Sequence, residues 1–277
     1  MKFQGVEVKR AMAVYAHPDD AEFGWAGTVA KLARGGVEVT YCMVTNGASG
    51  SDDPKMTRRK LRETRYAEQR AAAKILGVKH CVFLGYEDGY LYPTLEVRRD
   101  IARQIRIAKP DVLFAQDPST RYAGDYVNHP DHIAAGEATL RSINPDASTR
   151  QMFPELWKKE RLEPHKPKLL LLGSFGGDGT VVDIGDTLEI KVKALLAHTS
   201  QLWPGADDMI RDWAKRAGKS KGYRAGETFR VLRVGVNEVE EEKEAERTRG
   251  RRGAQRKRAT SARSPRKRTP SRSRRAR

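Results

Sequence analysis

The chain has 277 residues, with 53 Lys and Arg against 36 Asp and Glu, and a formal net charge of +17 at pH 7. This length suits one large α/β domain or two small ones. The charge is unevenly distributed, because residues 238–277 hold 16 basic and 6 acidic side chains whereas residues 1–237 hold 37 and 30. We therefore expect an ordinary folded body over residues 1–237 and a distinct tail over residues 238–277.

The composition argues against secreted and membrane-spanning proteins. Charged residues within the first ten positions interrupt any apolar stretch that could act as a signal peptide. The longest apolar runs, such as residues 169–173, are too short to cross a membrane. The two cysteines, Cys42 and Cys81, both lie in apolar strand-like runs, which excludes a disulfide framework and a cysteine-rich zinc site. We expect a cytoplasmic protein.

Short apolar runs alternate with helical patterns along the body of the chain. Four runs predict strands: residues 10–16, 37–45, 80–85 and 111–116. Four intervening patterns predict helices: residues 21–34, 57–76 with Thr57 as the cap, 95–109 and 132–143. Buried strands that alternate with helices indicate a Rossmann-like α/β fold, in which a mostly parallel sheet is covered by helices on both faces.

The second half of the body is less regular. Residues 145–167 are rich in proline and charge and are predicted to form an excursion on the surface. Residues 168–175 and 180–186 predict further strands, and residues 188–196 predict a helix. Residues 229–236 are predicted to form an edge strand.

Two polar segments carry the candidate chemistry, AHPDDAE at residues 16–22 and NHPDHIAAG at residues 128–136. Each follows a predicted strand and opens a predicted helix. In the usual doubly wound order the first and fourth strands are neighbours, and their carboxyl ends border the crevice where ligands bind. The two segments would then face each other across one crevice.

These segments supply the ligand types that a borderline metal such as Zn²⁺ prefers. His17 and Asp20 stand three positions apart in the first segment, and His129 and His132 do so in the second. Three ligands leave room for a water molecule, and a nearby carboxylate such as Asp19 can take its proton. Spacing alone does not decide which of the two downstream histidines binds the metal.

Each residue alone also has an ordinary structural explanation. Asp19 or Asp20 can simply cap the following helix, a routine use of aspartate after a strand. A single loop histidine is more often a surface hydrogen-bonding residue than a ligand. Two such turns on adjacent strand ends arise by accident much less readily, so the joint pattern favours a metal site.

The chain resembles the LmbE-like, or PIG-L, family of zinc-dependent de-N-acetylases over about residues 9–235. The resemblance rests on the AHPDD and HPDH motifs, in order and at strand ends, with weaker matches at VTNGASG, FLGYEDG and KVKALLAHTSQ. It implies a Rossmann-like fold and one Zn²⁺ per chain, or Fe²⁺ or another divalent metal. The implied reaction removes an N-acetyl group from a small-molecule amino sugar or glycoside, such as an N-acetylglucosamine derivative.

The resemblance also implies roles for individual residues. By motif position it implies three metal ligands: His17, Asp20 and His132. Asp19 resembles the general base for the attacking water. His129 resembles the group that stabilises the oxyanion and protonates the leaving amine, with Asp131 orienting it. Amide hydrolysis needs such a set, because the amine is a poor leaving group.

Four residues are candidate substrate contacts: Asn46, Ser49, Tyr86 and His198. The loop at residues 46–50 stands where bacillithiol-type relatives carry an Arg-Gly-Glu run, so a contact made by that arginine is absent or replaced. Tyr86 can line a sugar subsite or simply pack in its loop. His198 is a candidate because the AHTSQ segment recurs near the site in the family; its own pattern is that of a helix residue that can simply pack.

Two other function classes compete with this interpretation. A Rossmann nucleotide-binding enzyme, such as a dehydrogenase or methyltransferase, would share the fold. The turn after the first strand, however, reads His-Pro-Asp-Asp and not G-x-G-x-x-G, so a pyrophosphate would meet carboxylates. A nucleic-acid-binding protein is suggested by the basic tail, and this can coexist with an enzyme body. The sequence leaves a homo-oligomer open.

The tail generates a prediction of its own. Residues 249–277 carry 14 Lys and Arg with no acidic and no aromatic residue, so we expect a disordered segment that binds nucleic acid or another polyanion weakly. The alternative is a solvated extension with no partner. Binding to duplex DNA should fall with salt at a log–log slope of about −0.9 per phosphate neutralised. A chain ending at Asn237 should lose this binding and keep its hydrolytic activity. Equal DNA binding by the shortened chain would place the site elsewhere.

Overall fold

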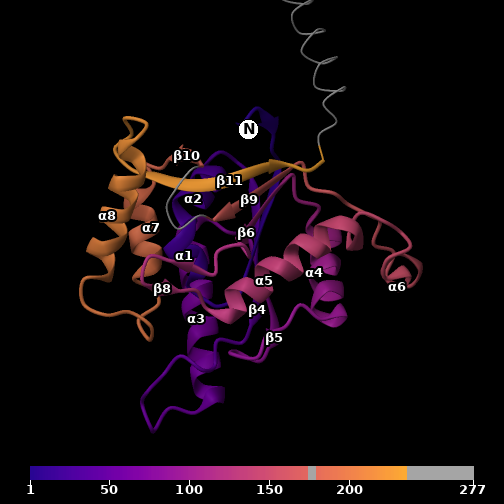
Figure 1. Ribbon diagram of the computed structural model, residues 1–277, viewed down its shortest axis with the longest axis horizontal. Helices are drawn as coiled ribbons and strands as arrows, with labels where there is room; N and C mark the ends of the chain where they lie inside the picture. Colours follow the sequence, from indigo (N-terminus) through magenta and orange to yellow (C-terminus); the bar gives the residue numbers. More distant parts are fainter. Residues whose placement is uncertain (174–178, 236–277) are drawn as a thin grey trace, which may run out of the picture. The chain divides into compact units, whose positions relative to one another are not determined.

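A computed structural model describes residues 1–173 and 179–235 of the chain (Figure 1). The predicted tail at residues 238–277 and the predicted boundary at residue 237 lie outside the described residues. No helix within the described ranges is long and apolar enough to span a bilayer.

A seven-stranded sheet forms the centre of the fold. Its strands follow in the spatial order β10 (Thr180–Asp183), β11 (Gly226–Arg233), β9 (Leu169–Gly173), β6 (Val112–Gln116), β3 (Arg10–Tyr15), β4 (Glu38–Thr45) and β5 (His80–Tyr86). The five strands from β9 to β5 are parallel, whereas β11 runs antiparallel to both of its neighbours. The predicted mostly parallel α/β sheet is therefore confirmed.

Helices lie against both faces of this sheet (Figure 1). One face carries α4 (Leu95–Ala108) and α5 (Pro130–Arg141). The other helices of the sheet layers contact one another on the opposite side: α1 (Asp20–Gly24), α2 (Ala26–Arg34), α3 (Arg58–Leu76), α7 (Leu188–Leu195) and α8 (Ala206–Lys219). Shorter elements complete the described chain: β1 (Lys2–Phe3), β2 (Val6–Glu7), β7 (Tyr122–Ala123), β8 (Tyr126–Val127), a π-helical turn (Ser142–Asp146) and α6 (Pro154–Lys158).

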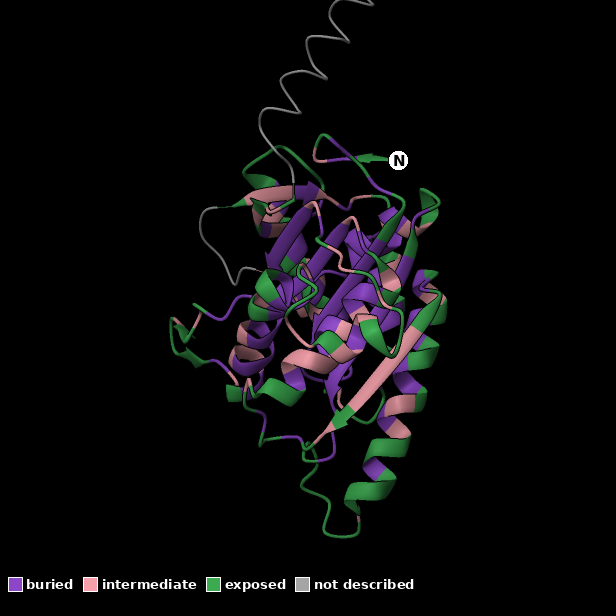
Figure 2. Cartoon of the chain, turned by 90° about the vertical axis from the view of Figure 1, so that its right-hand side faces the viewer, coloured by how far each residue is buried: buried purple, intermediate pink, exposed green. Residues whose placement is uncertain are grey.

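The apolar periodicity of the sequence explains how the layers pack. Val97, Ile101 and Ile105 recur every four residues on α4, and all three are buried against the sheet, where they meet Met12 and Leu113. Burying each such side chain contributes about 1.5–3 kcal/mol. Figure 2 shows the consequence, because the central strands are buried over most of their length while the outer faces of the helices are exposed.

Three details differ from the predictions. The edge strand predicted at residues 229–236 is wrong, because β11 pairs on both sides and β10 forms the edge. The helix predicted over residues 21–34 is broken at Trp25, whose ring packs inward between Tyr15 and Phe114. Helix α8 was not predicted, although Ile210, Ala214 and Gly218 give it a buried stripe at four-residue spacing.

A buried ion pair joins β11 to α7, and its carboxylate also contacts α2. The Nζ atom of Lys191 on α7 lies 2.7 Å from Oε1 of Glu227, and both side chains are less than 5% exposed. Glu227 also accepts hydrogen bonds from the backbone N–H groups of Gly27 and Thr28, in the first turn of α2. One carboxylate thus ties together β11, α7 and α2.

We expect Lys191→Met to lower the free energy of unfolding by about 3–5 kcal/mol, because it leaves a buried carboxylate without its cation. The matched control is Arg141→Ala, which removes an exposed pair with Glu137 and should cost less than about 1 kcal/mol. Urea denaturation of the parent and both variants measures the difference. Equal losses in the two variants would show that burial does not set the strength of the Lys191 pair.

Candidate metal centre

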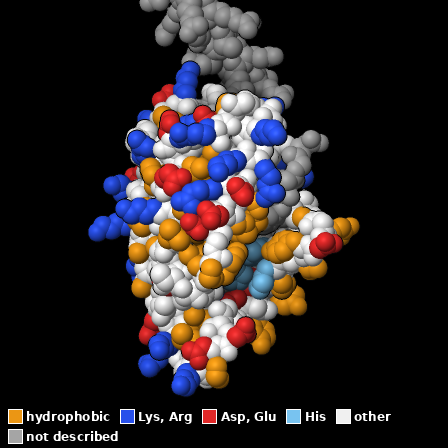
Figure 3. Space-filling view, turned by 90° about the vertical axis from the view of Figure 1, so that its left-hand side faces the viewer, with side chains coloured by type: hydrophobic (Ala, Val, Ile, Leu, Met, Phe, Trp, Pro, Cys, Tyr) orange, Lys and Arg blue, Asp and Glu red, His pale blue; other side chains and the backbone are white. Residues whose placement is uncertain are grey.

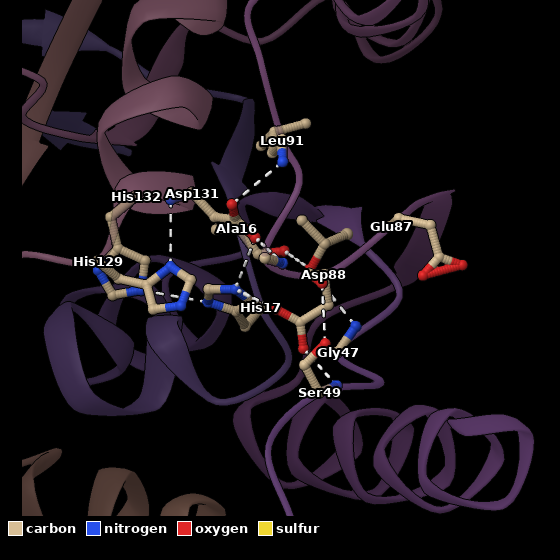
Figure 4. Close-up of polar contacts among 12 residues, drawn as sticks. Ala16, His17, Gly47, Ser49, Glu87, Asp88, Leu91, His129, Asp131 and His132 are labelled. Carbon is tan, nitrogen blue, oxygen red and sulfur yellow. Dashed lines mark hydrogen bonds and ion pairs between the residues drawn. The ribbon is translucent and has the colours of Figure 1, made fainter. Parts of the chain in front are cut away.

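The two polar motifs meet at the carboxyl ends of neighbouring strands. Strand β3 pairs directly with β6, so the turn after β3 lies beside the start of α5. This confirms the predicted order of the first and fourth strands. Figure 4 shows the ring of His17 next to those of His129 and His132, with the carboxylates of Asp88 and Asp131 on its other side.

Potential ligand atoms of three residues form a compact triangle, in which one oxygen of Asp20 faces each histidine. Nδ1 of His17 lies 3.2 Å from Nε2 of His132 and 3.5 Å from Oδ2 of Asp20. The Oδ1 atom of Asp20 lies 3.1 Å from Nε2 of His132. Tetrahedral zinc with bonds of about 2.0–2.1 Å separates its ligand atoms by about 3.4 Å. These three residues, the predicted ligands, are therefore spaced as one metal ion requires.

In both His17 and His132, the ring nitrogen that points away from the triangle (the outer nitrogen) lies next to an oxygen atom. These contacts fix the orientation of the inner nitrogen, which points into the triangle. Nε2 of His17 lies 3.0 Å from Oδ1 of Asp88 and 3.3 Å from Oδ2 of Asp131, and Nδ1 of His132 lies 3.0 Å from Oδ1 of Asn128. Because these oxygens are acceptors, they assign the ring protons to the outer nitrogens. The two inner lone pairs then face each other beside a carboxylate, an arrangement that a cation stabilises.

The electrostatics of the site also favour a cation. Burial alone would lower the pKa of His17, but hydrogen bonds to Asp131, Asp20 and Asp88 raise it well above its usual value. Burial alone would raise the pKa values of the three carboxyl groups, yet the neighbouring histidines lower all three, that of Asp88 to about 2. Ionised carboxylates gathered in a buried site need positive charge close by.

Asp19 occupies a strained position at the start of α1. Its φ of 95° lies in the left-handed region, and its side chain makes no capping hydrogen bond, so it does not serve as an ordinary helix cap. Its backbone N–H donates to Oε1 of Gln69 at 3.0 Å, and its Oδ2 lies 3.3 Å from Nη2 of Arg65. Burial raises the pKa of Asp19 to about 6, although Arg65 opposes the shift.

His129 caps α5 with its ring rather than lying within the triangle. Its Nδ1 accepts the backbone N–H of Asp131 at 3.1 Å, which leaves Nε2 as the donor atom of the neutral ring. Burial and the nearby His17 lower its pKa. His17, His129 and Asp131 form a second group with metal-binding potential, in which Nε2 of His17, the nitrogen that faces Asp88, lies 3.3 Å from Oδ2 of Asp131.

The carboxylate of Asp131 contacts His17 and not the ring it was expected to orient. It is fully buried and accepts the backbone N–H groups of Gly89 at 2.7 Å and Leu91 at 3.2 Å. Asp131 also contacts His129 through its backbone N–H, which donates to Nδ1 of that ring. The orienting role predicted for Asp131 stays a prediction.

The four predicted substrate contacts are distributed differently around the site. Ser49 is exposed, and its backbone N–H donates to Asp88 at 2.8 Å. Asn46 is buried and holds its own loop by accepting the N–H of Ala48. The hydroxyl of Tyr86 donates to Asp100 on α4 at 2.7 Å.

His198 is fully buried, and its Nε2 lies 3.2 Å from Oε2 of Glu22. As contacts to substrate, all four residues stay predictions.

Several residues of the site were missed by sequence reasoning. Asp88 stands in the FLGYEDG segment, a turn after the third strand that could have suggested it. Gln116, the last residue of β6, donates to Oδ2 of Asp20 at 3.1 Å. Arg65 and Gln69 lie on α3 among many charged residues, and no motif distinguishes them there.

Comparison with known proteins agrees with this geometry. A sequence profile of the family described as "PIG-L: GlcNAc-PI de-N-acetylase" matches residues 12–143. The diacetylchitobiose deacetylase of Thermococcus kodakarensis is 31% identical over 234 residues, which cover 82% of this chain and 84% of that protein. The chain belongs to the PIG-L family. The resemblance predicted from the motifs is thereby confirmed.

Two further relatives support this membership. The crystal structure of N,N'-diacetylchitobiose deacetylase from Pyrococcus horikoshii, in complex with an inhibitor, matches with a TM-score of 0.75 and 31% identity, over 82% of this chain and 85% of that one. The 1D-myo-inositol 2-acetamido-2-deoxy-alpha-D-glucopyranoside deacetylase of Actinosynnema mirum is 28% identical over 70% of this chain and 81% of that protein. The family profile is described as that of a de-N-acetylase, and these relatives are deacetylases.

We expect one metal ion per chain, and we expect His17→Ala, Asp20→Ala and His132→Ala each to lose it. His80→Ala, which alters an exposed histidine on β5, is the matched control and should keep the metal. Metal content per chain, measured after purification without chelators, checks this. A parental metal content in His17→Ala or His132→Ala would contradict the ligand assignment.

Proposed function

We propose that this PIG-L member is a metal-dependent hydrolase that removes the acetyl group from an N-acetylglucosamine-type sugar or glycoside. The observation that carries the proposal is the triangle of His17, Asp20 and His132, with the buried Asp19 directly before Asp20 in the same turn. The names of its relatives support the substrate class, since they act on diacetylchitobiose and on an acetamido sugar joined to inositol.

The donor set suits zinc, because two imidazole nitrogens and one carboxylate oxygen leave a fourth position of a tetrahedron open. Fe²⁺ or another divalent ion of similar preference is the alternative. When bound, such an ion supplies Lewis-acid chemistry, which acidifies water and polarises the amide carbonyl.

The residues of the chain supply the proton transfers. Asp19 is proposed to accept the proton of the attacking water, with its backbone held by Gln69 and its carboxylate by Arg65. His129 is proposed to donate a hydrogen bond from Nε2 to the amide oxygen as negative charge develops on it. The proton removed from water finally reaches the sugar nitrogen. The C–N bond breaks, and the products are a free amine and acetic acid, which ionises to acetate.

Two further hypotheses rest on the sequence composition alone. We propose that the deacetylase body ends at about residue 237 and that residues 249–277 form a separate polyanion-binding tail. We also propose that the protein acts in the cytoplasm, as its cysteine usage suggests.

We expect Asp19→Asn to keep the metal and to lower kcat by about 10²- to 10⁴-fold, because an amide matches the carboxylate in shape but does not accept the proton. His129→Ala should also keep the metal and lose activity. Amine release from N-acetylglucosamine and N,N'-diacetylchitobiose, with metal content measured on the same samples, tests both. Near-parental turnover in Asp19→Asn would exclude it as the base, and loss of metal from His129→Ala would make it a ligand.

A further inference from the structure

An exposed aromatic pair stands beside the metal centre. Phe23 and Trp203 are stacked, with ring centroids 5.9 Å apart and planes inclined by 9°, and Trp203 is 51% exposed. Phe23 follows the ligand Asp20 by three positions on α1, so the two side chains share one side of that helix. The stack therefore lies next to the metal triangle along α1.

A second exposed surface with aromatic side chains lies near the metal triangle, on β8, directly before the second motif. On β8, the hydroxyl of Tyr126 lies 3.5 Å from Oδ1 of Asn128, the atom that also accepts Nδ1 of His132. Its strand neighbours are open to solvent, with Tyr122 75% and Val127 78% exposed. Figure 3 shows histidine side chains in a hollow of the surface with hydrophobic side chains on either side.

The loop that carries Trp203 is held firmly in place. Glu68 on α3 accepts the hydroxyl of Thr199 at 2.9 Å and both the N–H and the hydroxyl of Ser200 at 2.7 Å. Gln201 donates to the backbone oxygen of Gly50 at 3.2 Å. A loop anchored in this way presents its exposed indole in a fixed position, so little entropy is lost when a ligand stacks on it.

These surfaces suit a carbohydrate ring. One face of a pyranose is lined by C–H bonds and packs on aromatic faces, while its hydroxyls remain in water. The N-acetyl group of a reacting sugar must lie at the metal centre, so whatever is attached to that sugar extends onto the rim. We propose that Trp203, backed by Phe23, and Tyr126 form a second sugar-binding subsite for the residue linked to the reacting N-acetylglucosamine.

This inference rests on the proposed deacetylase function and deepens it, because it makes a disaccharide the preferred substrate class. The full-length, metal-loaded chain should release amine from N,N'-diacetylchitobiose with a higher kcat/KM than from N-acetylglucosamine. Trp203→Ala should lower kcat/KM for the disaccharide by about tenfold, mainly through KM, and leave the monosaccharide value unchanged. Trp203→Phe should restore most of the loss.

Trp213→Ala is the matched control, since Trp213 on α8 is also exposed, at 42%, but has no part in the proposed subsite. Equal kcat/KM values of the parent for the two sugars would overturn the subsite. So would a Trp203→Ala variant that loses activity equally on both, or that changes the oligomeric state of the chain instead. If the metal-loaded parent releases no amine from either sugar, the proposed function itself fails, a result distinct from these.

Discussion

The parallel pairing of β3 with β6 is the constraint on which the rest of the site depends. It brings the turn after β3 and the start of α5 to one edge of the sheet, although they are more than a hundred residues apart in sequence. Gln116, at the end of β6, accepts the N–H of Ala16 at 3.0 Å and donates to Asp20 at 3.1 Å. The last side chain of β6 thus helps to orient Asp20, a proposed ligand in the turn that follows β3.

Charge is the second constraint, and it follows from the first. Once the two turns meet, Asp20, Asp88 and Asp131 surround one imidazole, that of His17, in a site with little access to water. Backbone N–H groups of the loop after β5 offset part of this charge, since Gly89 and Leu91 donate to Asp131. The inner nitrogens are left facing the carboxylate of Asp20, which is the environment that the proposed divalent ion requires.

Sequence reasoning succeeded where the signal was local. Apolar runs predicted the parallel strands, Thr57 caps α3 as expected, and the spacing within each motif predicted residues that the structure brings together. It failed where position depends on tertiary packing. Arg65 and Gln69 read as part of a charged helix surface, yet both are buried, because α3 lies over the turn that holds Asp19. Strand β11 lies inside the sheet because it pairs with both β10 and β9, and its own residues carry no pattern that predicts these two pairings.

Helix α3 also links the proposed chemistry to the proposed specificity. Gln69 holds the backbone of Asp19, and the next residue before it, Glu68, anchors the loop that presents Trp203. Gln69 also donates to Glu22. Glu22 in turn contacts His198, which lies at the start of that loop. The loop that presents the indole and the backbone of the proposed base are therefore held by the same helix, α3. Because one rigid helix holds both the proposed base and the loop of the proposed subsite, a second sugar would add to substrate binding without disturbing the placement of Asp19.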